Sequence, residues 1–226
     1  MKPVKERPIL FSAPMVRAIL AGEKTVTRRV AKPRKWPSLL DESWSDGYVL
    51  DEGNREWLMR DNPYGQPGDR LWVRETWGVI SHDFDEHGNM VDWAPDRPAQ
   101  EIREMRFGRG YYTGHVIYAA DGPAEWAGDD DGGGEPRSAW HPSIHMPRIA
   151  SRILLEITDV RVERLQDISE EQAEAEGVGF LRAAPDFDET LTAKQLFEIL
   201  WDHINGEGAW KANPWVWCVS FRRVEQ

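Results

Sequence analysis

A lysine and a threonine lie three positions apart in residues 22–29, which read Gly-Glu-Lys-Thr-Val-Thr-Arg-Arg. Lys24 follows a glycine at which a helix can end, and Thr27 belongs to a β-branched run typical of a strand. A lysine beside a hydroxyl can act as a base or an electrostatic anchor, provided that burial lowers the lysine pKa. The two side chains point apart on an ideal strand, so they converge only if residues 22–25 bend. The alternative interpretation is an exposed, basic hairpin edge.

Glu176 is a second candidate because it lies at the predicted end of a helix. Residues 169–172, Ser-Glu-Glu-Gln, form a capping box that begins this helix, and Gly177 ends it. The helix dipole disfavours a carboxylate at that end, and such a carboxylate suits general acid–base catalysis. The alternative is a glutamate that is simply tolerated on an exposed helix end.

Residues 70–77 alternate as a strand should. Trp72 and Arg74 share one face, from which they could stack on a base and hydrogen-bond to it. Core packing is the default interpretation for a tryptophan at strand spacing. Elsewhere, His141 and His145 are separated by four positions, but neighbouring prolines and the absence of a nearby cysteine argue against zinc. The sequence predicts no metal site and no cofactor, since no phosphate loop, dinucleotide fingerprint or nucleophile elbow is present.

These residues require a scaffold of short strands and helices. The expected strands are residues 9–11, 25–30, 70–77, 111–118, 151–165 and 215–221, the last of them central. The expected helices are residues 13–21, 169–177 and 192–205. Irregular insertions are expected at about 32–66, 81–109 and 121–141. Connection lengths favour antiparallel pairing, so we predict one α+β domain over residues 1–226, a small barrel decorated by long loops.

The charge distribution is uneven. The net charge is −11, yet residues 1–35 carry ten Lys/Arg and two Asp/Glu, a net of +8. Acidic residues gather in 36–61, 81–109 and 120–137, where they either keep the protein soluble or leave a basic N-terminal face for an anionic ligand. No apolar run could span a bilayer or serve as a signal peptide, and the single cysteine, Cys218, excludes an internal disulfide. These features predict a soluble, cytoplasmic protein with no membrane partner.

Several motifs together resemble one family. Residues 9–29, Ile-Leu-Phe-Ser-Ala-Pro-Met-Val-Arg-Ala-Ile-Leu-Ala-Gly-Glu-Lys-Thr-Val-Thr-Arg-Arg, resemble the opening of ASCH-domain proteins, whose β-barrel is related to the PUA domain of RNA-modifying enzymes. Residues 68–77 are similar to the second motif of that family, and residues 146–152 and 165–178 to a branch common in phages and prophages. The resemblance covers the chain apart from its three acidic loops.

The resemblance implies binding of RNA, nucleosides or modified bases in a cleft of the barrel. One small bacterial branch removes the acetyl group from N4-acetylcytidine, and its catalytic Lys, Thr and Glu fall on Lys24, Thr27 and Glu176. Thr27 would then be the nucleophile, Lys24 would activate it or hold the oxyanion, and Glu176 would deliver a proton to the leaving amine. The ligand-binding candidates are Arg29, Trp72, Arg74 and Glu75. This chain is about twice as long as that enzyme, and substrate choice often depends on such added loops.

Three functions therefore stay open at this point. The first is an amidohydrolase acting on N4-acetylcytidine or another modified nucleoside, and the second is a non-catalytic RNA- or base-binding module. The third is a ribonuclease. The net charge of −11 favours a modified nucleoside or a short single-stranded RNA as partner over a long duplex, and the sequence predicts no particular protein partner.

Overall fold

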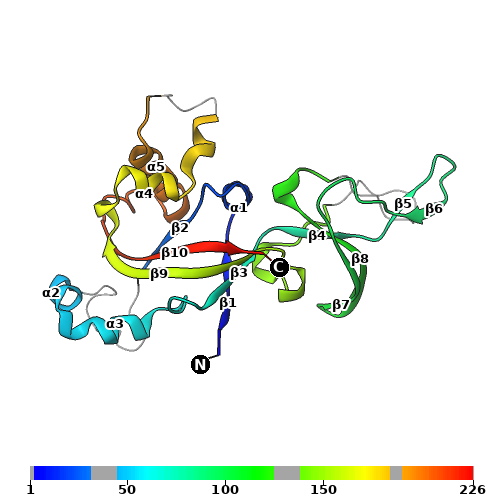
Figure 1. Cartoon of the computed structure of the whole chain (residues 1–226). Coiled ribbons are helices and arrows are strands. Elements are labelled where there is room, and N and C mark those ends of the chain that lie inside the picture. The colour runs from blue at the N-terminus through cyan, green and yellow to red at the C-terminus, as the bar shows by residue number, and fades with distance from the viewer. Residues whose placement is uncertain (1–2, 32–44, 125–137, 184–189, 226) are drawn as a thin grey trace. The chain divides into compact units, whose positions relative to one another are not determined.

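A computed structural model describes residues 3–31, 45–124, 138–183 and 190–225. The chain forms two compact units, each assembled from separate stretches of sequence (Figure 1). Unit 1 comprises Met1–Arg7, Ala18–Leu71 and Leu155–Gln226, and unit 2 comprises Pro8–Arg17 and Trp72–Leu154. The expectation of a single domain over residues 1–226 stays a prediction.

A five-stranded sheet carries the first group of candidate residues. Its strands, in spatial order, are β1 (Glu6–Leu10), β3 (Arg70–Arg74), β9 (Leu154–Arg164), β10 (Trp215–Val224) and β2 (Val26–Val30). The prediction that residues 215–221 form a central strand is confirmed, because β10 lies between two neighbours. It pairs antiparallel with β2, where Val219 faces Thr27. The first five residues of β10 are all buried, as expected of a strand covered on both faces.

Helices form where the sequence provides their ends. They are α1 (Ala13–Leu20), α4 (Glu170–Ala175) and α5 (Ala193–Asn205). The predicted capping box of α4 is present: the Ser169 hydroxyl accepts from the Gln172 backbone, and the Gln172 side chain accepts from the Ser169 backbone. Helices α4 and α5 lie side by side (Figure 1), and the Glu170 carboxylate accepts a hydrogen bond from the Lys194 backbone.

The expected irregularity of residues 32–66 is wrong for the part that the structure describes. Two short helices occur there, α2 (Asp46–Leu50) and α3 (Arg55–Asp61). A local cap explains α2, since the Ser45 hydroxyl accepts from Tyr48 N, whereas Asn54 at the N-terminus of α3 makes no side-chain cap hydrogen bond. Six short 3₁₀ helices complete the described chain: η1 (Glu52–Asn54), η2 (Ala119–Asp121), η3 (Ser143–His145), η4 (Arg148–Ala150), η5 (Leu165–Asp167) and η6 (Val178–Ala183).

Residues 81–109 were also expected to be irregular, and this is wrong. They contain the hairpin β5 (His82–Phe84) with β6 (Met90–Asp92), followed by β7 (Gln100–Phe107). Buried and exposed residues do not alternate regularly along β7, because its register with β8 shifts between Ile102 and Met105. Both of these residues lie in the core. Of the third expected insertion, residues 125–137 lie outside the described residues.

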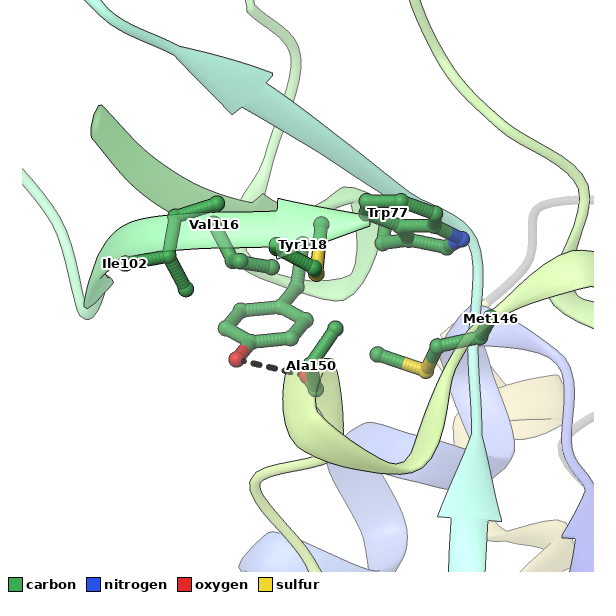
Figure 2. Close-up of a cluster of buried hydrophobic side chains, with 7 residues drawn as sticks. Trp77, Ile102, Val116, Tyr118, Met146 and Ala150 are labelled. Atoms are coloured by element: carbon green, nitrogen blue, oxygen red, sulfur yellow. Dashed lines mark hydrogen bonds between the residues drawn. The ribbon is translucent and has the colours of Figure 1, made fainter. Parts of the chain in front are cut away.

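Unit 2 is built on a three-stranded sheet in the order β4 (Trp77–Ile80), β8 (Gly110–Tyr118) and β7. The single strand expected over residues 70–77 is divided, because β4 belongs to this sheet while β3 does not. Figure 2 shows the core beside it, where the Tyr118 hydroxyl donates to the Ala150 carbonyl oxygen at 3.1 Å. The core residues are Trp77, Ile102, Met105, Val116, Tyr118, Met146 and Ala150.

The fold class is mixed α+β, as predicted. The described strands fall into sheets of five, three and two strands, and the pairs β10–β2, β4–β8, β7–β8 and β5–β6 are antiparallel. A closed barrel is not found among these described strands. No helix within the described ranges is both long and apolar enough to cross a membrane.

Candidate functional site

A bend after α1 brings Lys24 beside Glu176. Gly22 adopts a φ of +79°, and the backbone N–H groups of Glu23 and Lys24 both donate to the Ala18 carbonyl oxygen. Lys24 then pairs with Glu176 as an isolated antiparallel bridge. The sequence analysis required a bend here to bring Lys24 to Thr27. The bend that is present joins Lys24 to Glu176 instead, which lies far away in the chain.

The ammonium group of Lys24 is fully buried and surrounded by acceptors. It donates to Glu176 Oε2 at 2.8 Å, to the Glu176 carbonyl oxygen at 2.7 Å and to the Val26 carbonyl oxygen at 2.9 Å. Burial is the largest influence on this group and lowers the pKa of Lys24, although the charge of Glu176 acts in the opposite direction. The direction of this shift is the one that a catalytic lysine base requires.

Glu176 is held by a second cation that the sequence analysis missed. Arg28 Nη1 donates to Glu176 Oε1 at 3.1 Å, so each carboxylate oxygen has its own cationic donor. Arg28 also donates to Glu163 and to Gln172 Oε1. These cations explain why a carboxylate is tolerated at the C-terminus of α4. Strand alternation could have identified Arg28, because residues 24, 26 and 28 would lie on one face of an ideal strand.

The ion pairs continue from this point to the surface. Arg161 donates to Glu163 Oε2 at 2.8 Å and to Asp159 Oδ2 at 3.2 Å. The resulting series of paired, alternating charges consists, in order, of Lys24, Glu176, Arg28, Glu163, Arg161 and Asp159. The side chains of Lys24, Glu176 and Arg28 are at most 4% exposed, and exposure then rises to 56% at Asp159. The buried charges are thus all paired, as charges in a protein interior must be.

Thr27 and Arg29 lie on the same strand as Arg28, at the alternate positions that belong to its opposite face. Thr27 is only 3% exposed and immediately follows Val26, whose carbonyl oxygen accepts from Lys24 Nζ. Arg29 is half-buried and lies opposite Trp217 in the β2–β10 register. Lys24 is thus bonded directly to Glu176. Thr27 lies in β2 next to Val26, whose carbonyl oxygen accepts from Lys24.

Trp72 and Arg74 belong to unit 2. The Arg74 guanidinium carbon lies 4.6 Å from the centroid of the Trp72 ring, which confirms that the two side chains share a face. Arg74 Nη1 also donates to the Ile144 carbonyl oxygen at 3.1 Å. Because Trp72 is buried and already stacked by a protein cation, base stacking by Trp72 stays a prediction.

Glu75, the remaining candidate, lies at a buried ion-pair centre of unit 2. Arg152 donates to both of its carboxylate oxygens at 3.0 Å and also binds Asp121. The Arg152 guanidinium lies 3.9 Å from the centroid of the Tyr118 ring. Burial raises the pKa of Glu75, while its bonds to Arg152 act against that shift. Glu75 therefore already has a protein partner for both oxygens.

Within the described ranges, no group of three or more His, Cys, Asp or Glu side chains is placed to hold a metal ion. His141, one of the two histidines weighed above, instead packs against Trp77 with ring centroids 4.7 Å apart. Its contacts are those of an aromatic cluster.

Comparisons with models of protein families, with curated proteins and with solved structures found no match to this chain. The ASCH resemblance therefore rests on the sequence motifs and stays a prediction. Lys24, Glu176 and their neighbours supply the chemistry from which a function can be inferred.

Proposed function

We propose that this chain is an ASCH-type protein with a PUA-like barrel that hydrolyses the exocyclic amide of N4-acetylcytidine or a similarly acylated nucleoside. The nucleoside is free or part of a short single-stranded RNA. One observation carries the proposal: the Lys24 ammonium lies 2.8 Å from the Glu176 carboxylate, with both side chains buried. A buried lysine of lowered pKa next to a carboxylate is an arrangement suited to acid–base catalysis.

The Lys24–Glu176 contact can produce a base and an acid in one step. Transfer of one proton from Nζ to Oε2 leaves a neutral lysine and a protonated glutamate, and no charge moves to solvent. Lys24 then accepts the Thr27 hydroxyl proton as Oγ1 attacks the acyl carbon, and Glu176 gives its proton to the leaving nitrogen when the C–N bond breaks. Water hydrolyses the acyl ester of Thr27, which releases the carboxylic acid and restores the hydroxyl group.

A non-catalytic binding module is the second candidate, and a different observation favours it. Lys24, Thr27 and Glu176 are each 3% exposed or less, and the Lys24 ammonium already donates to three protein oxygens. In that case the pair is a structural anchor, and the ligand binds without being cleaved. The described residues offer no observation in favour of a ribonuclease.

The test is incubation of the full chain with N4-acetylcytidine, followed by chromatography for cytidine. Wild type should release cytidine, and Lys24→Met or Glu176→Gln should reduce the rate by about 100-fold or more. Arg60→Met serves as the control, because Arg60 belongs to an exposed ion pair with Glu56. Intact-mass measurement of the reacting protein should reveal an acetyl group that Thr27→Ala lacks.

Each outcome separates the candidates, provided that thermal unfolding shows every variant to be folded. If wild type binds the nucleoside in calorimetry without releasing cytidine, the binding module replaces the hydrolase. If Lys24→Met is as active as wild type, the lysine has no catalytic role. Shortening of a labelled RNA would instead identify a ribonuclease.

A further inference from the structure

Unit 2 contains a cavity outside the site described above. Its volume is about 630 Å³, which falls within the roughly 300–1,000 Å³ of small-molecule sites in proteins. Its walls are residues 79–84, 93, 96–97 and 123–124, from the end of β4, the first strand of the hairpin and two loops. Lys24, Thr27 and Glu176 all belong to unit 1, and none of them lines this cavity.

Two aromatic side chains line the cavity, and each is held by a neighbour. Phe84 packs against His82 with ring centroids 5.5 Å apart at 90°, and His82 Nδ1 lies 2.9 Å from Ser81 Oγ. Trp93 packs against His115 with centroids 5.5 Å apart at 65°. Side chains that are fixed in advance lose little entropy when a ligand binds. The cavity therefore offers two aromatic side chains, each in contact with a histidine ring, to a flat ligand.

Arg97 joins two segments of the cavity wall and neutralises one of the carboxylates in it. Its guanidinium donates to Asp96 Oδ1 at 2.8 Å and to the Pro123 carbonyl oxygen at 2.5 Å. It thereby neutralises Asp96 and ties two of the lining segments together. Among the described residues of the lining, Asp83 is left without such a counter-charge, so Asp83, Asp96 and Arg97 together carry a net charge of −1 with histidine neutral. The surrounding residues 81–109 add to this, with four basic and seven acidic side chains.

We propose that this cavity binds a planar, positively charged nitrogen heterocycle, of which an N-methylated nucleobase is an example. Aromatic faces attract cations and also stack on flat rings, and an unneutralised carboxylate favours positive charge further. An anionic ligand such as a phosphate fits poorly, since Arg97, the cation that the described part of the lining supplies, is occupied by Asp96 and Pro123. This ligand class is distinct from the neutral acylated cytidine of the proposed hydrolase.

Two isomeric nucleosides test the proposal directly by titration calorimetry with the full chain. At neutral pH, 1-methyladenosine carries a positive charge on its ring, whereas N6-methyladenosine has the same composition and is neutral. We expect 1-methyladenosine to bind about tenfold or more tightly than its isomer. Trp93→Ala should weaken this binding at least about tenfold, because it removes a stacking surface. Asp83→Asn should abolish most of the preference for the charged isomer.

Matched controls exclude a general effect of losing a tryptophan or a charge. Trp57→Ala removes an exposed tryptophan of α3, and Glu104→Gln removes an exposed carboxylate of β7; both should bind 1-methyladenosine as wild type does. Equal affinity for the two isomers would overturn the charge preference. Unchanged binding in Trp93→Ala, or no binding of either nucleoside, would overturn the cavity as the site. Because cytidine release is measured separately, the two proposals can fail independently.

Discussion

Gly177 lies so close to Lys24 that a Cβ atom at position 177 would come within 2.8 Å of the Lys24 Cβ. The same atom would lie 2.9 Å from the Cβ of Ala18, and the φ of Gly177 is +77°. Both side-chain stems are short and attached to fixed backbone, so they cannot move aside cheaply. The residue after Glu176 must be a glycine for α4 to end beside the lysine.

Gly177→Ala should therefore destabilise the protein. The positive φ alone costs about 1–2 kcal/mol, and the two close contacts add to this. Urea unfolding followed by tryptophan fluorescence measures the loss as a lower midpoint. Gly179→Ala is the matched control, because a Cβ at position 179 meets nothing within 4 Å and the φ there is not positive. Equal midpoints for the two variants would contradict the packing described.

Glu176→Leu should be among the most damaging substitutions in unit 1. It leaves the ammonium of Lys24 and part of the Arg28 guanidinium buried without their shared anion, which typically costs about 3–5 kcal/mol. Adding Lys24→Met should restore part of the loss, since one of the two unpaired charges is then gone. A double-mutant cycle in urea unfolding measures the interaction free energy between Lys24 and Glu176. Glu56→Leu, in an exposed pair with Arg60, should leave the midpoint unchanged.

The lowered pKa of Lys24 predicts a specific dependence of stability on pH. Between the folded-state pKa and the unfolded value of 10.5, the unfolded chain binds more protons than the folded one. Stability contributed by this residue should therefore rise with pH through that window and be lost as pH falls through the folded-state pKa. The measurement is urea unfolding of wild type and Lys24→Met from neutral pH to about the unfolded pKa. If the difference between the two proteins does not change with pH, the lysine is not desolvated.

Cys218 provides a probe of unfolding that needs no substitution. It is buried in β10, and burial raises its pKa to about 12, so the reactive thiolate is scarce at neutral pH. A coloured thiol reagent should therefore label the native protein only as fast as β10 opens, and denaturant should make labelling immediate. Because Cys218 is the sole cysteine, the labelling signal comes from that position alone. Rapid labelling of the folded protein would show that β10 is accessible.

The parts of the fold that local chemistry defines could be predicted from the sequence. Helix α1 and the bend after it follow from an apolar stripe and Gly22, and α4 follows from its capping box. The central position of β10 follows from a continuous apolar run. Lys24 and Glu176 could be selected because one follows a helix-ending glycine and the other precedes one.

Other features depend on contacts between distant residues and leave little local signal. Arg28 bonds to Glu163 and Glu176, which lie more than a hundred positions away, so its partners cannot be identified from the residues near it in the sequence. Strand β7 was missed because its register shift breaks the alternation that identifies a strand. The cavity of unit 2 combines three segments, each of which looks like a polar loop when considered alone.

The pairing of β2 with β10 has a consequence for the order of events during synthesis. Thr27, Arg28 and Arg29 are translated early, yet their strand partners Val219, Cys218 and Trp217 emerge from the ribosome almost the full length of the chain later. Until then, β2 lacks the neighbour that satisfies its backbone groups. The segment that carries the candidate nucleophile therefore cannot mature before β10 has emerged. Any activity it has should appear only once β10 is available to pair, and a nascent chain stalled before β10 should be inactive and exposed to proteases.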